Sequence, residues 1–320
     1  MKISEIGYII WAAQTLGIIK SRADFHKTYS TKEDVLRTLG NDSKVISMVQ
    51  TLKADASWEH KIDGVVCFFD DEFPVINTNV KANGDKPYLL FYKGNLSLLN
   101  DLNRNVAVIG HTSPDEFIEE RERNIVAQLV QQNIVIVSGL AKGCDMISHD
   151  ECMKQGGQTI AILPSPIHNI LPKEHMQEAQ RILESGGLLI SEYDADPKNF
   201  SYEQSKRYID RDRLQAMFAK LVLLIASYAE GDGDSGARHA MQKAEKYSHE
   251  RCVIYDESKD AYLSDMKLNR QLVESGKTKV LLESQESNGG NYITIADIVN
   301  LKNPHLTAKC ECESVQDTLF

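Results

Sequence analysis

The chain has 320 residues and a net charge of −10, and 42% of its residues are hydrophobic. This length suits about two domains with full cores. The acidic balance argues against a surface that is basic all over, as in many nucleic-acid-binding proteins, but it leaves room for a local basic groove. No apolar run reaches the ~20 residues of a membrane helix, and no signal peptide is recognisable, so we expect a cytoplasmic protein without a membrane partner.

The six cysteines are too sparse for a disulfide scaffold and lack the C-x-x-C spacing of a zinc site. Cys310 and Cys312 form one C-x-C pair in the tail, a spacing that is more often incidental than metal-binding when no partner ligand is nearby. We therefore expect reduced thiols, no metal site and no cofactor.

Residues 1–62 carry a helical pattern of apolar residues. Ile6, Ile10 and Ala13 recur at three- and four-residue steps, and Thr31-x-x-Asp34 opens another amphipathic helix. This pattern predicts a small helical domain. Short extended segments at 65–69 and 88–92 follow, and we expect the stretch 63–93 to line the edge of the next sheet.

Strands and helices alternate over the main domain, which we place at residues 63–285. The apolar runs are continuous, as buried parallel strands require, and they predict strands at 105–110, 134–138, 158–163, 188–192, 221–226, 251–255 and 279–283. Gly156-Gly157 and Gly186-Gly187 are predicted to end helices, and Ser113-Pro114-x-Glu116 to cap one. The pattern predicts an α/β fold with a doubly wound parallel sheet, followed by a short helix and flexible tail over 286–320.

Ligands of such sheets bind beyond the C-terminal ends of the strands. The turn from Ser138 to Gly143 follows one strand, and its glycines allow backbone N–H groups to converge on an anion beside the Lys142 ammonium. The turn matches neither a dinucleotide fingerprint nor a P-loop, which argues against an ordinary dinucleotide or Walker-type site. From the spacing alone, a ligand site and a plain connection both remain open.

Polar residues at other strand ends have alternative roles. Gly110, His111 and Thr112 follow the first strand of the domain and either cap a helix or contribute to an anion site. Asp145 and His149 lie four residues apart on one helix face, where they form an acid/base or metal pair or brace the turn. Because no nucleophile or third ligand is apparent, we assign no catalytic residue. Glu192 ends another strand as a structural acceptor.

The segment before residue 221 interleaves aromatic and basic residues: Phe200, Tyr202, Lys206, Arg207, Tyr208, Arg211 and Arg213. Aromatic faces stack on unpaired bases and guanidinium groups bind phosphates, so this mixture suits single-stranded DNA. A solvated amphipathic helix is the other interpretation. The loop containing Ser235 and Gly236 is a further candidate anion site, although Asp232 and Asp234 weaken it.

These motifs together resemble the DNA-processing protein family DprA, also called Smf. The ordered set comprises Tyr92-Lys93-Gly94, Val106 to Gly110, Ser138 to Asp145 with His149, Gly156 to Leu163, Ser191-Glu192-Tyr193, Arg211-Asp212-Arg213 and Ser235-Gly236. The resemblance implies an extended Rossmann-like domain after a helical domain, a homodimer, and binding of single-stranded DNA for delivery to the RecA recombinase. It also implies that Lys142 and the Gly110 and Gly139 turns hold DNA phosphates, with Arg211 and Arg213 nearby.

The chain departs from the family pattern at four places. His111 and Thr112 stand where the family usually has a small polar residue and a phosphate-binding arginine, and Asp212 stands where it has asparagine. Leu163-Pro164-Ser165-Pro166 replaces Leu-Gly-x-Gly, and Ala237 replaces a serine. These changes remove positive charge from the expected groove, which weakens DNA binding or redirects the site to a smaller phosphorylated ligand.

The last five residues, Gln316 to Phe320, resemble the Q-x-x-L-F peptide that binds the bacterial DNA sliding clamp. Leu319 and Phe320 suit an apolar pocket, and Gln316 a hydrogen bond beside it. Docking of this end on its own domain is the alternative.

Our leading hypothesis for the whole chain is a non-catalytic, DprA-like mediator that binds single-stranded DNA in DNA uptake, recombination or defence against foreign DNA. The alternative is a nucleotide-binding sensor or hydrolase using the same phosphate site.

Overall fold

The computed structural model describes residues 1–197, 199–282 and 291–306. Within these ranges one sheet of ten strands has the order β1-β2-β6-β5-β4-β3-β7-β8-β9-β10. Its parallel part consists of β3 (Asn105–Ile109), β4 (Val135–Ser138), β5 (Thr159–Leu163), β6 (Leu188–Ser191), β7 (Leu221–Leu224), β8 (Glu250–Ile254) and β9 (Lys279–Leu281). The predicted α/β fold with a doubly wound, mostly parallel sheet is confirmed.

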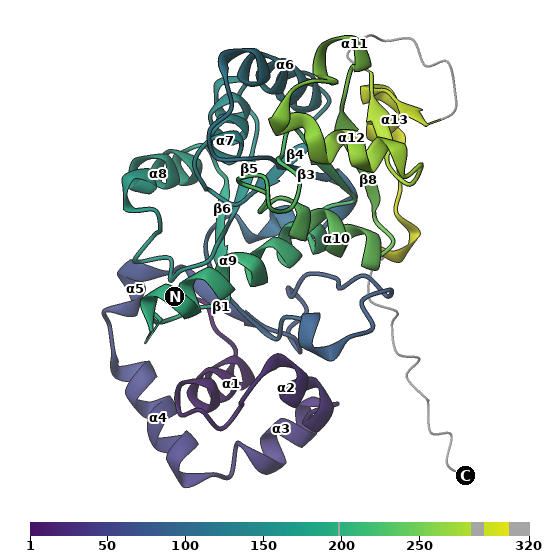
Figure 1. Ribbon diagram of the computed structural model, residues 1–320. Coiled ribbons are helices and arrows are strands. Elements are labelled where there is room, and N and C mark those ends of the chain that lie inside the picture. The colour runs from purple at the N-terminus through teal and green to yellow at the C-terminus, as the bar shows by residue number, and fades with distance from the viewer. Residues whose placement is uncertain (198, 283–290, 307–320) are drawn as a thin grey trace, which may run out of the picture.

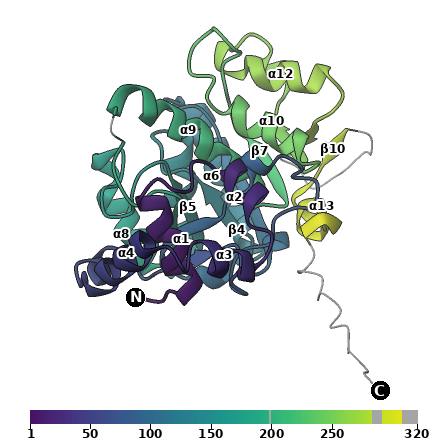
Figure 2. The same cartoon turned by 90° about the horizontal axis from the view of Figure 1, so that it is seen from below.

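Two further strands extend one edge of this sheet. β1 (Gly64–Cys67) and β2 (Leu89–Gly94) pair antiparallel, and β2 pairs antiparallel with β6. The segment 63–93 thus contributes two strands at this edge of the sheet. At the other edge, the short strand β10 (Tyr292–Ile293) runs parallel to β9, so the sheet continues beyond residue 285. Figure 2 shows these ends on opposite sides, with α4 (Ser43–Ala54) and α8 (Met176–Glu184) far from β10.

Helices cover both faces of the sheet because successive strand residues point to opposite faces and both sets are apolar. Ala107 and Ile109 of β3 pack under α9 (Phe200–Met217) and α10 (Arg238–Lys246). Val106 and Val108 pack on the other face, under α6 (Glu116–Gln131), α7 (Cys144–Lys154) and α13 (Ile295–Asn300). α12 (Lys267–Glu274) adds apolar residues to the α9 and α10 side, and α11 (Glu257–Asp260) lies beside α6, where Asp260 pairs with Arg121.

The first five helices precede the sheet in the chain, and most of them gather at one end of the molecule, as Figure 1 shows in purple. They are α1 (Glu5–Thr15), α2 (Arg22–Thr28), α3 (Lys32–Thr38), α4 and α5 (Trp58–Lys61). Their apolar residues share one core with the edge strands: the indole of Trp11 meets the ring of Phe91 edge-on, at 5.4 Å between centroids. The helical segment therefore packs directly on the sheet.

The predicted start of α6 was wrong by two residues. The helix begins after Asp115, whose carboxylate accepts the N–H of Ile118 at 2.9 Å, so Ser113 is not the cap. Aspartate caps a helix as well as serine does. Pro114 lies against the turn at Gly143, so the helix begins only after Asp115. The double glycines at 156 and 186 do follow the ends of α7 and α8, and the first glycine of each pair has a positive φ.

Candidate nucleic-acid interface

A pocket of about 360 Å³ opens beyond the C-terminal ends of β3, β4 and β7. The chain leaves β3 toward β4 on one side and returns to β7 on its other side, so this is the point where the strand order reverses. Ligands of doubly wound sheets bind at such switch points. The lining includes Gly110, Thr112, Ala141, Lys142, Asp145, Tyr208, Arg211, Asp212, Gln215, Asp234 and Gly236.

Two glycines allow the turn between β4 and α7 to close around this pocket. A Cβ on Gly139 would lie 1.0 Å from Nη1 of Arg211, so the guanidinium occupies the space that any side chain here would need. Gly143 has a φ of +69°, and a Cβ there would lie 2.5 Å from the carbonyl oxygen of His111. The N–H of Cys144 donates to that same carbonyl at 3.2 Å. Glycine at 139 and 143 therefore brings the two strand-end loops together.

Side chains of the pocket already take several of its backbone donors. The N–H of Ala141 donates to Asp145 at 3.2 Å, and the N–H of Thr112 donates to Asp234 at 2.9 Å. With the Gln215 amide in the orientation that satisfies both of its neighbours, its oxygen accepts the N–H of Gly139 at 3.0 Å. Within the described residues, the N–H groups of Lys142 and Gly143 bond to no other group. These two donors and the Lys142 ammonium therefore remain for an anion.

Lys142 and Arg211 differ in how available their charges are. The Lys142 side chain is 60% exposed and forms a surface ion pair with Glu174, at 2.6 Å between Nζ and Oε1. Such exposed pairs contribute little and exchange readily. Arg211 is buried, with Nη1 3.5 Å from Asp145 and Nε 3.1 Å from Asp212. Its charge is largely compensated before any ligand arrives.

The carboxylates around Arg211 make this pocket unusual for a polyanion site. Burial raises the pKa of Asp212 to about 7; Asp145 and Asp234 add to the rise, while Arg211 opposes it. Burial also raises the pKa of Asp145, again against the effect of Arg211. The lining of the pocket thus contains two cations, Lys142 and Arg211, and three acidic residues, Asp145, Asp212 and Asp234.

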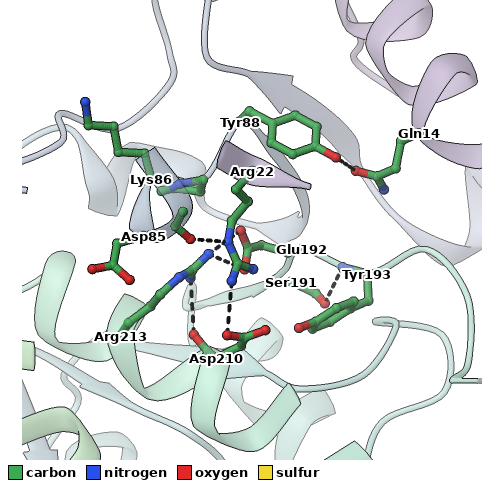
Figure 3. Close-up of polar contacts among 12 residues, drawn as sticks. Gln14, Arg22, Asp85, Lys86, Tyr88, Ser191, Glu192, Tyr193, Asp210 and Arg213 are labelled. Carbon is green, nitrogen blue, oxygen red and sulfur yellow. Dashed lines mark hydrogen bonds and ion pairs between the residues drawn. The ribbon is translucent and has the colours of Figure 1, made fainter. Parts of the chain in front are cut away.

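Arg213 lies on the other side of α9 and does not line this pocket. Its Nη2 atom lies 2.6 and 2.7 Å from the two carboxylate oxygens of Glu192, and both side chains are buried. Figure 3 shows this pair next to Arg22 and Asp210, with Arg22 reaching both Glu192 and Asp210. Glu192 therefore accepts from two guanidinium groups and joins α9 to the N-terminal helices.

The other predicted site residues have structural contacts. His111 is buried, with its ring 5.3 Å from that of Tyr228, and Oγ of Ser138 donates to the carbonyl of Val108. Ser235 accepts from Arg238 through both its carbonyl and its hydroxyl oxygen. Nδ1 of His149 lies 2.7 Å from Oγ1 of Thr159, and burial lowers the pKa of His149 to about 3. Asp145 is therefore the one member of the Asp145 and His149 pair that lines the pocket.

The sequence interpretation did not assign Asp212, Gln215 or Asp234 to the phosphate site, and it named Tyr208 only within the aromatic and basic segment. Tyr208, Asp212 and Gln215 join Arg211 at three- and four-residue steps, so helical periodicity alone would have grouped them. Asp234 was noted only as a charge that disfavours an anion.

Within the described chain, no three His, Cys, Asp or Glu side chains are arranged to hold a metal ion, and no helix is long and apolar enough to cross a membrane. The four cysteines described there are buried and unpaired.

A doubly wound sheet with an open pocket at its switch point defines a Rossmann-like α/β protein with a candidate ligand site. Residues 64–287 match the family described as DNA recombination-mediator protein A. The chain belongs to this family, and the predicted resemblance to DprA and Smf is confirmed.

Individual relatives agree with this assignment. DNA processing protein DprA of Streptococcus pneumoniae is 35% identical over 127 residues, which is 39% of this chain and 44% of that protein. Protein Smf of Escherichia coli is 29% identical over 162 residues, 51% of this chain and 42% of Smf. The chain thus spans less than half the length of these curated relatives.

Two solved structures share the fold. The crystal structure of the S. pneumoniae protein matches with a TM-score of 0.62 at 22% identity, over 88% of this chain and 95% of that one. A Helicobacter pylori DNA processing protein A, described for its single-stranded DNA binding mode, matches with a TM-score of 0.55 at 24% identity, over 68% and 90% of the chains. At these identities the likeness is one of fold.

Proposed function

We propose that this chain binds single-stranded DNA in the pocket between the Lys142 turn and α9, and acts as a non-catalytic mediator in DNA uptake, recombination or defence against foreign DNA. Its membership of the recombination-mediator family supports this role, as does the single-stranded DNA binding described for the H. pylori protein. The observation that carries the proposal is the exposed Lys142 side chain at the pocket, in a turn where the backbone N–H groups of Lys142 and Gly143 have no partner among the described residues. Such a group of donors suits a phosphate.

A nucleotide-binding sensor or hydrolase is the second candidate. The volume of about 360 Å³ falls within the range of small-molecule sites, and the three acidic residues disfavour a long polyanion. The contacts of His149 and Glu192 speak against hydrolysis, because both side chains are engaged away from the pocket. A sensor is therefore the stronger form of this alternative.

Salt dependence separates the two candidates. The purified chain is titrated by fluorescence anisotropy with oligo-dT, duplex DNA and a panel of nucleotides at two salt concentrations. A strand held through several phosphates loses affinity steeply with salt, by ~0.7 in the logarithmic slope for each contact, whereas one nucleotide in a pocket does not. Preference for a nucleotide with a shallow slope would contradict the DNA proposal.

Partner contacts follow from the same proposal. We propose that the protein acts in the cytoplasm as a homodimer that delivers DNA to the RecA recombinase.

The tail residues Gln316, Leu319 and Phe320 lie outside the described residues, and for them we propose binding to the DNA sliding clamp. Deleting Leu319 and Phe320 is expected to abolish co-elution with the clamp, and retained co-elution would exclude this peptide. Sedimentation equilibrium tests the dimer, and pull-down with RecA on oligo-dT tests delivery.

A further inference from the structure

A second cavity of about 490 Å³ lies between the N-terminal helices and α9. We call it the Arg22 cleft. Its walls include Lys20 and Arg22 at the start of α2, Tyr193 after β6, and Lys206 and Arg207 on α9. The cleft and the switch-point pocket therefore share α9 as a wall: Tyr208, Arg211, Asp212 and Gln215 line the pocket, and Lys206, Arg207 and Asp210 line the cleft.

The acidic groups of the Arg22 cleft are held by neighbouring donors. Glu192 accepts from Arg213 and lies 3.4 Å from Arg22, and Asp210 lies 3.0 Å from Arg22. Figure 3 shows these carboxylates converging on the guanidinium of Arg22. Asp194 accepts the indole N–H of Trp11 at 2.7 Å. These contacts reduce the repulsion that the three carboxylates would exert on an incoming anion.

Three cations of the same cleft have no carboxylate at ion-pair distance among the described residues: Lys20, Lys206 and Arg207. Both lysines are exposed. The guanidinium of Arg207 lies over the Tyr193 ring, 4.0 Å from its centroid, and donates to the carbonyl of Ala195 at 2.8 Å. The cleft thus has four cations against three engaged carboxylates, whereas the switch-point pocket has two cations against three.

Exposed side chains continue this surface along α9. Tyr202 is 72% exposed and Ile209 is 45% exposed, and with Lys206 they occupy steps of four and three residues on one face of the helix. An exposed aromatic ring next to a free ammonium group suits a base stacked beside its phosphate.

We infer that the Arg22 cleft is a second contact region for single-stranded DNA, which a strand reaches from the switch-point pocket by crossing the exposed face of α9. Lys20, Lys206 and Arg207 bind its phosphates, and Tyr202 stacks with a base. This inference rests on the proposed DNA binding. It assigns the acidic pocket to one end of a longer site whose positive charge lies mainly between the N-terminal helices and α9.

The test compares oligo-dT of about 4 and about 16 nucleotides, which span the usual range of single-strand site sizes. The variant Lys20→Ala/Lys206→Ala/Arg207→Ala is expected to lose affinity for the long oligonucleotide and to keep that for the short one. Its salt slope on the long strand should fall by about 2, because each phosphate contact contributes ~0.7. The matched control is Lys32→Ala/Lys44→Ala/Arg104→Ala, which removes the same charge from cations that have no ion pair in the described structure and line neither cavity.

Arg207 packs on Tyr193, so a second variant limited to the two exposed lysines, Lys20→Glu/Lys206→Glu, keeps the test independent of folding. Unchanged binding of the long strand by both variants would overturn the Arg22 cleft and leave the switch-point pocket standing. Equal losses of affinity for both lengths would also overturn the inference. A strand of about 4 nucleotides would then depend on the cleft residues as much as a long one does, so the cleft would not be a second region that only a longer strand reaches. If the unmodified protein bound neither oligonucleotide, the proposed function would itself fail, and the inference with it.

Discussion

Arg211 and Arg213 lie two residues apart on α9 and point to opposite sides of it. Arg211 lies between Asp145 and Asp212 at the switch-point pocket, whereas Arg213 pairs with Glu192 beneath the N-terminal helices. Each residue of an α-helix turns the chain by about 100°, so two steps place side chains about 200° apart. The Arg-Asp-Arg motif therefore supplies one arginine to the pocket and one to the junction with the helical segment.

Breaking the junction pair should cost stability without affecting the pocket. Arg213→Ala leaves the buried Glu192 carboxylate with one fewer guanidinium, and removal of one partner of a buried ion pair costs about 3–5 kcal/mol. We expect the free energy of unfolding in urea to fall by about that amount. The double variant Arg213→Met/Glu192→Leu, which leaves no orphaned charge at this pair, should recover most of the loss. An unchanged urea midpoint for Arg213→Ala would show that the pair is not structural.

Lys142 offers the opposite contrast, because its ion pair is at the surface. Lys142→Ala should change the melting temperature little, since exposed ion pairs contribute little to stability, and should lower the salt slope for oligo-dT by ~0.7. Glu174→Gln should raise affinity, because it releases Lys142 from its partner. Lys154→Ala, which removes another exposed lysine paired with Asp150, is the control and should bind like the unmodified protein. Equal affinities for all three variants would remove Lys142 from the site.

Gly139 is predicted to be indispensable because Arg211 fills the space beside its Cα. A Cβ there would also lie 2.7 Å from Asp145, so Gly139→Ala forces the guanidinium away from its carboxylate. We expect a loss of at least about 1–3 kcal/mol, as in other overpacked sites, measured by urea unfolding. Gly84→Ala is the matched control, because its nearest neighbour to a new Cβ is 3.9 Å away. A Gly139→Ala protein as stable as this control would contradict the observed packing.

The sheet could be predicted because its signal is local. Each parallel strand is a short run of apolar residues buried on both faces, so the runs at β3 to β9 are visible without any knowledge of the partner strands. The turn between β4 and α7 could be recognised from its glycines, although the contact that requires Gly139 is with Arg211 on α9, far away in the sequence, whereas Gly143 is required by the neighbouring loop at His111.

The electrostatics of the site could not be predicted in this way, because the pairs are distant in sequence. Arg211 meets Asp145, 66 residues earlier, and Arg22 meets Glu192, 170 residues later. No periodicity reports such pairings. Helix geometry alone does exclude a shared pocket for Arg211 and Arg213, so grouping both with the phosphate site ignored a constraint that the sequence already contained.

Asp212 should make DNA binding depend on pH near neutrality. Burial, with Asp145 and Asp234 nearby, raises its pKa to about 7 despite the opposing effect of Arg211. Below that pH the carboxyl is protonated, so the pocket loses a negative charge and Arg211 loses a partner. Affinity for oligo-dT is therefore expected to increase as the pH falls from about 8 to about 6, which is the direction set by a raised carboxyl pKa.

The variant Asp212→Asn isolates this effect, because it is neutral at every pH and nearly the same size as aspartate. At a pH of about 8 it should bind oligo-dT more tightly by about 1 kcal/mol, or roughly fivefold, and most of the pH dependence should disappear. Asp145 also has a raised pKa, so a smaller rise in affinity at low pH should remain. Glu33→Gln, which removes one exposed carboxylate from α3, should follow the unmodified protein. Anisotropy titrations across this pH range decide the matter: identical profiles for Asp212→Asn and the unmodified chain would mean that Asp212 does not oppose the bound strand.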